Sequence, residues 1–152
     1  MTDTIVILNP TAGSPEHIRS WQERAKSLAG DCPIRVTSHS GEAEALARRA
    51  VEEGFARIVA AGGDGTVSQV ANGLAGSNAI LGVLPMGSVN VFAMELGLPL
   101  HNLQRCWDII EDTNLRLVDM PSANNKYFVQ LGGVGLDAQV VTLPFARAEA
   151  GA

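Results

Sequence analysis

Four short runs rich in aliphatic residues recur along this chain, each followed by a turn of small or polar residues and then by a helical pattern. The runs cover residues 4–8, 34–37, 57–61 and 80–84. The first, Thr-Ile-Val-Ile-Leu, shows no polar alternation, which is typical of a strand buried on both faces. Strand, turn and helix repeated in this order predict an α/β fold, in which an open, mostly parallel sheet carries helices on both faces.

Apolar side chains at helical spacing mark the segments between these runs. The first helix is expected to follow Ser14 and Pro15, which suit the N-cap and the first helical position, and to end at Gly30. Further helices are predicted over residues 42–53, 66–74 and 90–96, and around Leu103, Trp107 and Ile110 with Asn102 as the cap.

The pattern changes after residue 113. Residues 115–120 and 126–131 are predicted to be strands joined by a hairpin at Pro-Ser-Ala-Asn-Asn. We therefore divide the chain into an α/β domain over residues 1–113 and the first antiparallel strands of an incomplete, truncated β domain over residues 114–152. Open edges of such strands could pair with a second copy and form a homo-oligomer.

The charge balance limits the possible partners. The chain has 11 Lys and Arg residues against 16 Asp and Glu, a net charge of −5, which argues against a nucleic-acid partner. Phosphate ligands are not excluded, because backbone amides can bind them. The N-terminus has no basic segment before its short apolar run, and polar residues interrupt the longest apolar stretch, residues 79–96. We predict a cytoplasmic protein whose contact with a membrane would be peripheral.

A glycine-rich turn follows the third run directly. Gly62-Gly63-Asp64-Gly65-Thr66 leads from that run into a helix, and ligands of open α/β sheets bind beyond the carboxyl ends of the strands. Glycines let backbone N–H groups approach an anion, and the helix N-terminus favours negative charge. Asp64 would then hold Mg2+ directly or through water, or a hydroxyl group, and Thr66 would cap the helix or contact a phosphate oxygen. A tight turn with an Asp–backbone bond is the simpler alternative.

Two other runs end in turns of the same kind. Pro85-Met-Gly87-Ser88-Val-Asn90 follows the fourth run and offers a free backbone and short polar side chains, although a plain N-cap pair would also explain it. Asn9-Pro-Thr-Ala-Gly13 follows the first run. Three such turns at one edge of a sheet predict a polyphosphate or nucleotide cleft, which would make residues 1–113 the nucleotide-binding domain. The phosphate-binding P-loop motif is absent, and the dinucleotide fingerprint lacks its βαβ context.

The same three turns, with Asn72-Gly-Leu and Leu96-Gly-x-Pro99, resemble the diacylglycerol kinase catalytic domain family, which includes bacterial lipid kinases and sphingosine kinases. The resemblance covers roughly residues 4–141. It implies ATP-dependent phosphorylation of a lipid hydroxyl at a membrane surface, with ATP and Mg2+ as cofactors. By the family pattern, the phosphate region would be lined by Asn9, Gly63, Asp64, Gly65 and Thr66, the cleft would be completed by Gly87, Ser88 and Asn90, and Thr37 would lie near the nucleotide.

The chain departs from the family pattern in places. Ser88 stands where Thr is more frequent, and Val91 and Met94 stand where many members carry Asp and Arg. Family members usually continue into a β domain that supplies much of the lipid site and the general base. Residues 128–140 resemble the beginning of that domain, and Asp137 is the only acid among them. We therefore expect this chain to bind Mg·ATP and to be poorly active alone. An NAD kinase-like enzyme, which shares the Gly-Gly-Asp-Gly-Thr turn, and a non-catalytic nucleotide-binding or assembly module are the alternatives.

Overall fold

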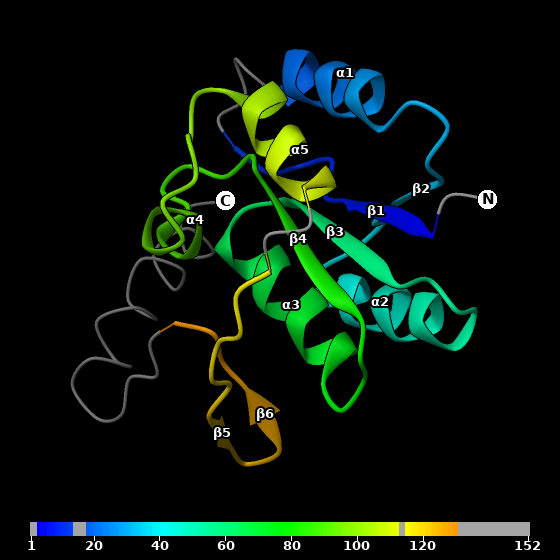
Figure 1. Ribbon diagram of the computed structural model, residues 1–152, viewed down its shortest axis with the longest axis vertical. Helices are drawn as coiled ribbons and strands as arrows, with labels where there is room; N and C mark the ends of the chain where they lie inside the picture. The colour runs from blue at the N-terminus through cyan, green and yellow to red at the C-terminus, as the bar shows by residue number, and fades with distance from the viewer. Residues whose placement is uncertain (1–2, 14–17, 113–114, 131–152) are drawn as a thin grey trace, which may run out of the picture.

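Four parallel strands form the centre of the molecule in the computed structural model, which describes residues 3–13, 18–112 and 115–130. Their order across the sheet is β2-β1-β3-β4, as Figure 1 shows. The strands are β1 (Thr4–Leu8), β2 (Ile34–Val36), β3 (Arg57–Gly62) and β4 (Ile80–Pro85). The parallel register aligns Leu8 with Ala61 and Ala61 with Leu84, so these strands end at the same edge. The predicted parallel sheet is confirmed.

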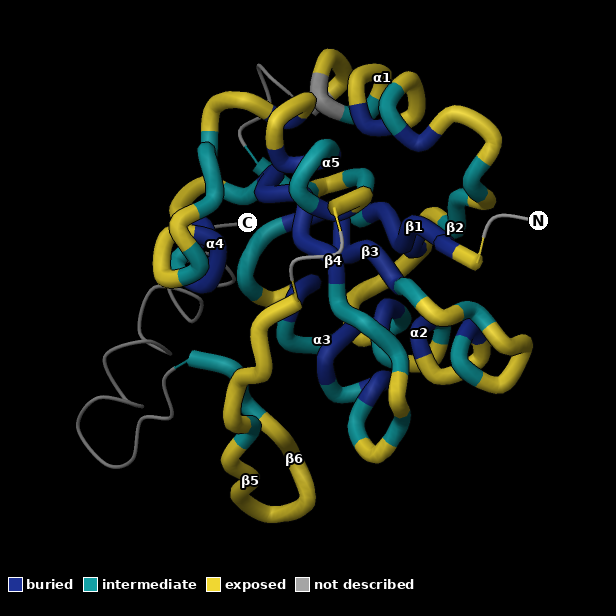
Figure 2. The backbone as a smooth tube through the Cα atoms, viewed as in Figure 1, coloured by how far each residue is buried: buried dark blue, intermediate teal, exposed yellow. Residues whose placement is uncertain are grey.

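Helices cover both faces of this sheet because successive strand residues point to opposite sides. Ile5, Ile7 and Ile58 pack with α2 (Glu42–Glu52), α3 (Asp64–Leu74) and α4 (Val91–Glu95) in one apolar cluster. Val6 and Leu8 pack in a second cluster with α1 (Ile18–Ala29) and α5 (Leu103–Glu111). Most of β1, β3 and β4 is accordingly buried in Figure 2. The predicted cap of α5 is also confirmed, because Asn102 Oδ1 accepts from Arg105 N at 3.0 Å.

The helices α2 and α3 approach each other closely at Gly73. A Cβ atom at this position would lie 2.5 Å from the carbonyl oxygen of Glu44 and 2.6 Å from Cβ of Ala47. Glycine is therefore required here by the distance between the two helix backbones rather than by an unusual backbone angle.

Two boundaries differ from the sequence-based prediction around the central turn. Strand β3 continues to Gly62, and α3 begins at Asp64 with Gly63 as its N-cap, so the helix starts two residues before the predicted Thr66. The start of α3 is not evident from the sequence because glycine has a low helix propensity. Its backbone can nevertheless adopt the helical conformation. Asp64 consequently belongs to the first turn of a helix rather than to a loop.

The predicted strand over residues 115–120 is wrong. The structure places only a short antiparallel pair after α5, formed by β5 (Ser122–Ala123) and β6 (Lys126–Tyr127). Asn124 and Asn125, with φ of 50° and 62°, form the turn, and asparagine tolerates this left-handed conformation. Part of the segment predicted as loop therefore forms strand β5. The predicted strand 126–131 is observed only over its first two residues, and residue 131 and Asp137 lie outside the described residues.

Side chains of the α/β layer hold this hairpin in place. Asn72 in α3 donates from Nδ2 to the carbonyl oxygen of Tyr127 at 2.7 Å and accepts at Oδ1 from Tyr127 N at 2.9 Å. Lys126 Nζ lies 2.8 Å from Glu44 Oε2 in α2. Across the described ranges, the structure contains no helix that is both long and apolar enough to cross a membrane.

Candidate functional site

Three loops meet at the edge of the sheet where β1, β3 and β4 end. A Cβ atom on Gly87 would lie only 2.5 Å from Cα of Gly63, so the loops after β3 and β4 touch backbone to backbone. A Cβ atom on Gly13, in the loop after β1, would lie 2.6 Å from the carbonyl oxygen of Met86. We call this edge the loop rim and define it as residues 9–13, 62–66 and 85–90. Its formation follows from parallel strands, whose carboxyl ends share one side of the sheet (Figure 1).

Asn9 and Thr66 join the first two loops. Asn9 Nδ2 donates to Thr66 Oγ1 at 3.0 Å, while Asn9 Oδ1 accepts from the backbone N–H and the hydroxyl of Thr11. The Thr66 side chain does not cap α3, because Gly63 is the N-cap, and Thr66 is only 4% exposed. The structure therefore shows Thr66 as a buried partner of Asn9 and corrects its predicted capping role.

Asn90 closes the third loop on itself. Its Oδ1 accepts from Gly87 N at 2.8 Å and its Nδ2 donates to the carbonyl oxygen of Gly87 at 2.7 Å. Asn90 is the N-cap residue of α4 with φ of 62°, but its side chain makes no capping hydrogen bond. The Gly87 amide is thus already paired, whereas Ser88 is exposed.

Asp64 reaches across the rim to the start of α4. Its Oδ1 accepts from Phe92 N at 3.2 Å and from Gln130 Nε2 at 2.7 Å. Burial opposes the charge on Asp64, but the hydrogen bonds from Gln130 and from backbone amides near the start of α4 outweigh it and lower its pKa. The carboxylate therefore stays ionised and links α3 by hydrogen bonds to the start of α4 and to Gln130. Sequence reasoning missed Gln130, whose position after β6 gives no signal for this contact.

Backbone donors are available at the start of α3. The first N–H groups of a helix have no acceptor within the helix, and the N-cap Gly63 supplies no side-chain acceptor. Gly65 is exposed, and a Cβ atom at this position would meet nothing within 4 Å, so there is open space beside this residue. Backbone N–H groups at an uncapped helix start suit an anion such as a phosphate.

Thr37 lies beside the same rim. It follows β2, is buried, and donates its backbone N–H to the carbonyl oxygen of Leu8 at 2.9 Å, immediately before Asn9. All the predicted site residues are therefore brought to one edge of the sheet. Their contact with a nucleotide remains a prediction.

The side chains of the loop rim could bind a metal ion only together with oxygens from a bound ligand or water. Within the described ranges, no group of three or more His, Cys, Asp or Glu side chains comes together. Asp64 is the single carboxylate in the three loops, and these loops contain no Lys or Arg. This set fits Mg2+, which commonly binds one or two carboxylates and takes its other oxygens from phosphates and water.

Replacing Asp64 by Ala or Asn should separate its hydrogen bonds from its charge. Alanine removes the acceptor for Phe92 N, which lies in the first turn of α4. The loss of a side-chain acceptor at a helix start costs about 0.5–2 kcal/mol of unfolding free energy. Asparagine keeps an oxygen acceptor and should retain more stability. Because the folded-state pKa of Asp64 is lowered, its charge stabilises the fold above its unfolded pKa of about 3.9, and this contribution is lost as the pH falls through the folded-state value.

Chemical denaturation from neutral pH to about pH 2.5 measures both effects. The Asn variant should lose less stability on acidification than the wild-type protein. Equal stability of the Ala and Asn variants at neutral pH would contradict the hydrogen-bonding role of this side chain.

The fold and the loop rim define an open parallel α/β protein whose candidate site lies beyond the carboxyl ends of the strands. The sequence model of the diacylglycerol kinase catalytic domain matches residues 3–123. The chain belongs to this family.

Similar proteins agree with this assignment. The chain is 37% identical over 142 residues to a probable lipid kinase YegS-like protein of Chromohalobacter salexigens, covering 91% of this chain and 45% of the relative. It is 33% identical over 135 residues to a diacylglycerol kinase of Bacillus subtilis, covering 86% and 45%. A crystal structure of a diacylglycerol kinase from Bacillus anthracis matches with a TM-score of 0.73 and 28% identity, covering 84% of this chain and 45% of that chain. The chain thus spans about 45% of the length of these relatives.

Proposed function

We propose that this chain is the nucleotide-binding part of an ATP-dependent lipid kinase, which transfers the γ-phosphate of ATP to a lipid hydroxyl. The observation that carries the proposal is the meeting of three glycine-bearing loops around the uncapped N-terminus of α3. Family membership and relatives named as lipid or diacylglycerol kinases support a lipid acceptor over the dinucleotide acceptor of an NAD kinase.

In this proposal the rim residues divide the work of binding ATP. The amides at the start of α3, next to Gly63 and Gly65, bind phosphate oxygens. Asn9 and Thr66 keep the first loop against α3, and Asn90 holds the shape of the third loop at Gly87. Thr37 and Ser88 border the nucleotide. These contacts position the phosphates, which is most of what phosphoryl transfer requires of a protein.

The charge of the phosphates is balanced by Mg2+ in this proposal. Because the three loops contain no Lys or Arg, their side chains supply no cation. Asp64 offers the carboxylate, and its lowered pKa keeps it ionised at neutral pH. Asp64 would hold Mg2+, which would supply positive charge against the phosphates.

The test is thermal unfolding of the 152-residue protein in a titration with Mg·ATP. Stabilisation should follow RT ln(1 + [L]/Kd), which amounts to about 2.7 kcal/mol at a ligand concentration of 100 times Kd. Asp64→Asn should reduce the Mg2+-dependent part of this stabilisation. The matched control is Asp108→Asn in α5, which also removes one carboxylate but lies outside the rim and should respond as the wild-type protein does.

An unmoved melting curve at millimolar Mg·ATP would refute the nucleotide site. Phosphate transfer to a diacylglycerol by the 152-residue chain alone should be weak, because the chain covers 45% of these relatives and the family pattern places the general base in the part of the relatives that it does not cover. The absence of a positioned base typically lowers the rate by about 10²–10⁴-fold.

A further inference from the structure

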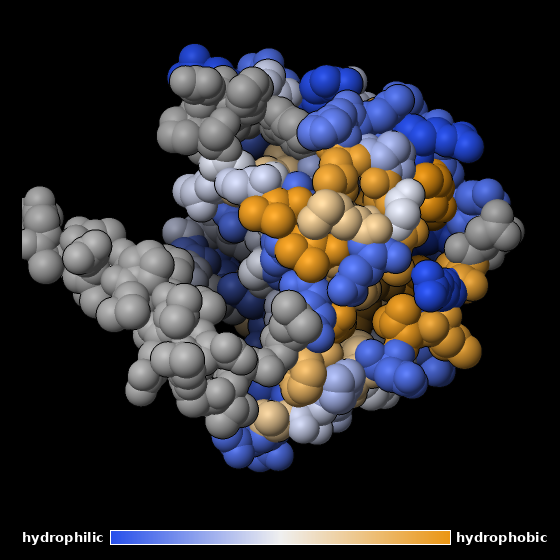
Figure 3. Space-filling model, turned by 90° about the vertical axis from the view of Figure 1, so that its left-hand side faces the viewer, coloured by the Kyte–Doolittle hydropathy of each residue, from blue (hydrophilic) through white to orange (hydrophobic). Residues whose placement is uncertain are grey.

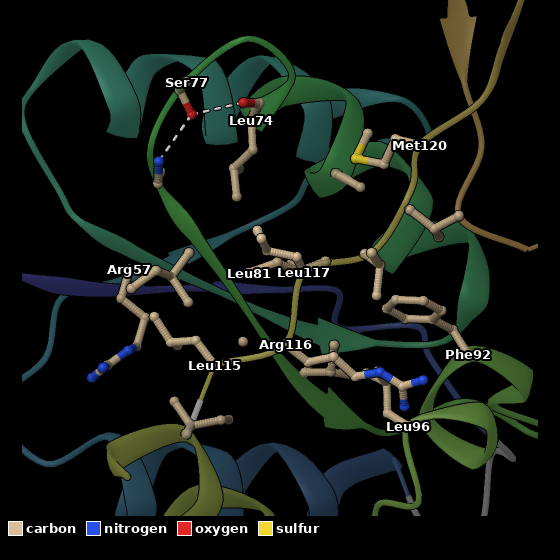
Figure 4. A pocket seen from close by; sticks show the side chains of 18 of the residues that line it. Arg57, Leu74, Ser77, Leu81, Phe92, Leu96, Leu115, Arg116, Leu117 and Met120 are labelled. Carbon is tan, nitrogen blue, oxygen red and sulfur yellow. Dashed lines mark hydrogen bonds between the residues drawn. The ribbon is translucent and has the colours of Figure 1, made fainter. Parts of the chain in front are cut away.

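The chain between α5 and the β5–β6 hairpin lies loosely against the sheet. Residues 115–120 form part of the wall of an apolar cavity of about 580 Å3, and the edge strand β4 forms another part. Figure 4 shows the lining side chains, from Arg57 and Leu115 at one end to Phe92 at the other. Leu115 and Leu117 are 62% and 100% exposed, and apolar side chains surround a hollow on the face shown in Figure 3. The segment that leads into the hairpin therefore does not fix where the hairpin lies.

The position of the hairpin along α3 is set by the side chain of Asn72. Residues 122–127 are all exposed. Asn72 accepts from Tyr127 N at 2.9 Å and donates to the carbonyl oxygen of Tyr127 at 2.7 Å, so its amide pairs with Tyr127 as a residue of a neighbouring strand would. It also donates to the carbonyl oxygen of Ser68 at 2.9 Å, which holds the amide against its own helix. Val129 packs against the apolar cluster around α3 and α4, but apolar contacts have no direction and do not set a register.

The same segment has a second anchor at the start of α3. Gln130 Nε2 donates to Oδ1 of Asp64, the first residue of α3, at 2.7 Å. Eight residues separate Asp64 from Asn72, which is about 12 Å along a helix, and the three residues from Tyr127 to Gln130 can span at most about 11 Å. A displacement of Tyr127 by one helical turn, about 5.4 Å, would take the Gln130 amide out of reach of Asp64. The contact at Asp64 therefore depends on the contact at Asn72.

Two donors from different parts of the chain orient the Asp64 carboxylate. Phe92 N at 3.2 Å and Gln130 Nε2 at 2.7 Å both donate to Oδ1, and neither uses Oδ2. A carboxylate with one donor can still rotate about that hydrogen bond, whereas two donors hold it in one orientation. Both donors are uncharged, so the full negative charge of the carboxylate is kept. Hydrogen bonds of this kind orient the ligands of metal ions in proteins.

We propose that Asn72 and Gln130 are positioning residues for Mg2+. Asn72 holds the 127–130 segment on α3, and the Gln130 amide holds the Asp64 carboxylate in the orientation in which it binds the metal. The inference rests on the proposed function, in which Asp64 offers its carboxylate to Mg2+, and it adds two residues outside the three loops of the rim. Both act through Asp64.

The first test measures the Kd of the 152-residue protein for Mg·ATP by thermal unfolding. Gln130→Ala should weaken binding about 10–100-fold, which is the usual effect of losing a group that orients a metal ligand. The matched control is Gln104→Ala in α5, because Gln104 Nε2 also donates to a carboxylate, Asp108 Oδ1, at 3.0 Å but lies outside the rim. It should bind Mg·ATP as the wild-type protein does. Tighter binding by Gln130→Ala would show that the amide competes with the metal and would overturn the inference.

A double-mutant cycle tests whether Asn72 acts through Gln130. Asn72→Ala removes both hydrogen bonds to Tyr127 and should weaken Mg·ATP binding by a similar factor, but it should add no further loss in a Gln130→Ala background. Additive losses would show that the two residues act independently and would contradict the proposal.

Lys126→Ala is the control for general docking of the hairpin. It breaks the ion pair with Glu44 but leaves Asn72 in place, and because exposed ion pairs contribute little, it should change the affinity less than about twofold. A loss equal to that of Asn72→Ala would remove the specific role of Asn72.

Amide hydrogen exchange in the ligand-free protein measures the positioning of Asp64 without any metal. Asn72→Ala and Gln130→Ala should each speed exchange at the Phe92 amide, because its acceptor is then held less firmly. Exchange at Val59, buried in β3, should not change. Unchanged exchange at Phe92 in both variants would show that the segment does not hold the carboxylate.

The two measurements distinguish failure of this inference from failure of the proposed function. If the wild-type protein and both variants bind Mg·ATP equally well, the nucleotide site stands and the positioning role is wrong. If the wild-type protein does not bind Mg·ATP, the proposed function fails together with the role in metal binding, and hydrogen exchange still decides whether the 127–130 segment holds Asp64.

Discussion

Gly87→Ala should abolish the stabilisation by Mg·ATP that the proposed nucleotide site predicts. The added Cβ atom would lie 2.5 Å from Cα of Gly63 and 2.8 Å from Asn90 Oδ1, so it would strike both the neighbouring loop and the side chain that shapes its own loop. The backbone of Gly63 has little room to retreat, because Met86 N donates to the carbonyl oxygen of Gly62 at 2.9 Å. We expect the loops to separate, at a cost of about 1–3 kcal/mol in unfolding free energy.

The matched control for the effect on fold stability is Gly65→Ala at the same rim; because Gly65 belongs to the proposed phosphate-binding turn, it is not a control for binding. A Cβ atom there meets nothing within 4 Å, so the fold should keep its stability. Urea denaturation measures the free energy of unfolding, and thermal unfolding with Mg·ATP measures binding. Undiminished Mg·ATP stabilisation in Gly87→Ala would show that the contact between the two loops is not needed for the site.

Gly73→Ala should destabilise the fold although it places a better helix former inside a helix. The helical preference of alanine over glycine contributes about 1 kcal/mol in favour of the variant. Against this, the new Cβ atom would lie 2.5 Å from the carbonyl oxygen of Glu44 and 2.6 Å from Cβ of Ala47. Overpacking costs about 1–3 kcal/mol, and the upper end applies here because the new Cβ atom meets a backbone oxygen. Less the gain of about 1 kcal/mol from helix preference, we expect a net loss of about 2 kcal/mol.

Gly65→Ala is the internal reference for this prediction, because it makes the same change in the same helix α3 where space is free. It should leave the urea midpoint unchanged or raise it, while Gly73→Ala should lower the midpoint with an unchanged slope. Equal midpoints for the two variants would show that α2 and α3 can separate without cost.

The α/β core was predictable because its signals are local. A strand such as Thr4–Leu8, buried on both faces, carries aliphatic side chains on both of its sides, and glycine or proline marks the turns that follow. The hairpin after α5 was not predictable in the same way. Residues 115–120 have a strand-like composition, but in the structure they cross one wall of the cavity beside β4 and form no ladder. Composition shows that a segment can be extended and does not show what it will pair with.

The candidate site was likewise predictable in part. The three loops could be assigned to one edge from the order of strands and helices alone, because parallel strands end on the same side. The hydrogen-bond partners of the polar side chains in these loops could not be predicted from the sequence. Asp64 lies 66 residues from Gln130 in the sequence, and Asn9 lies 57 residues from Thr66.

The amino-acid sequence by itself determined the parallel sheet, the helices on its two faces and the edge at which a ligand would bind, because each follows from short-range periodicity and chain connectivity. Tertiary structure alone decided that Asp64 accepts hydrogen bonds from Phe92 and Gln130, that Gly63 and Gly87 touch, and that an apolar cavity lies beside β4. The physical reason is that hydrogen bonds and steric contacts depend on distances of a few ångströms between residues far apart in the chain, and only the packed fold sets those distances.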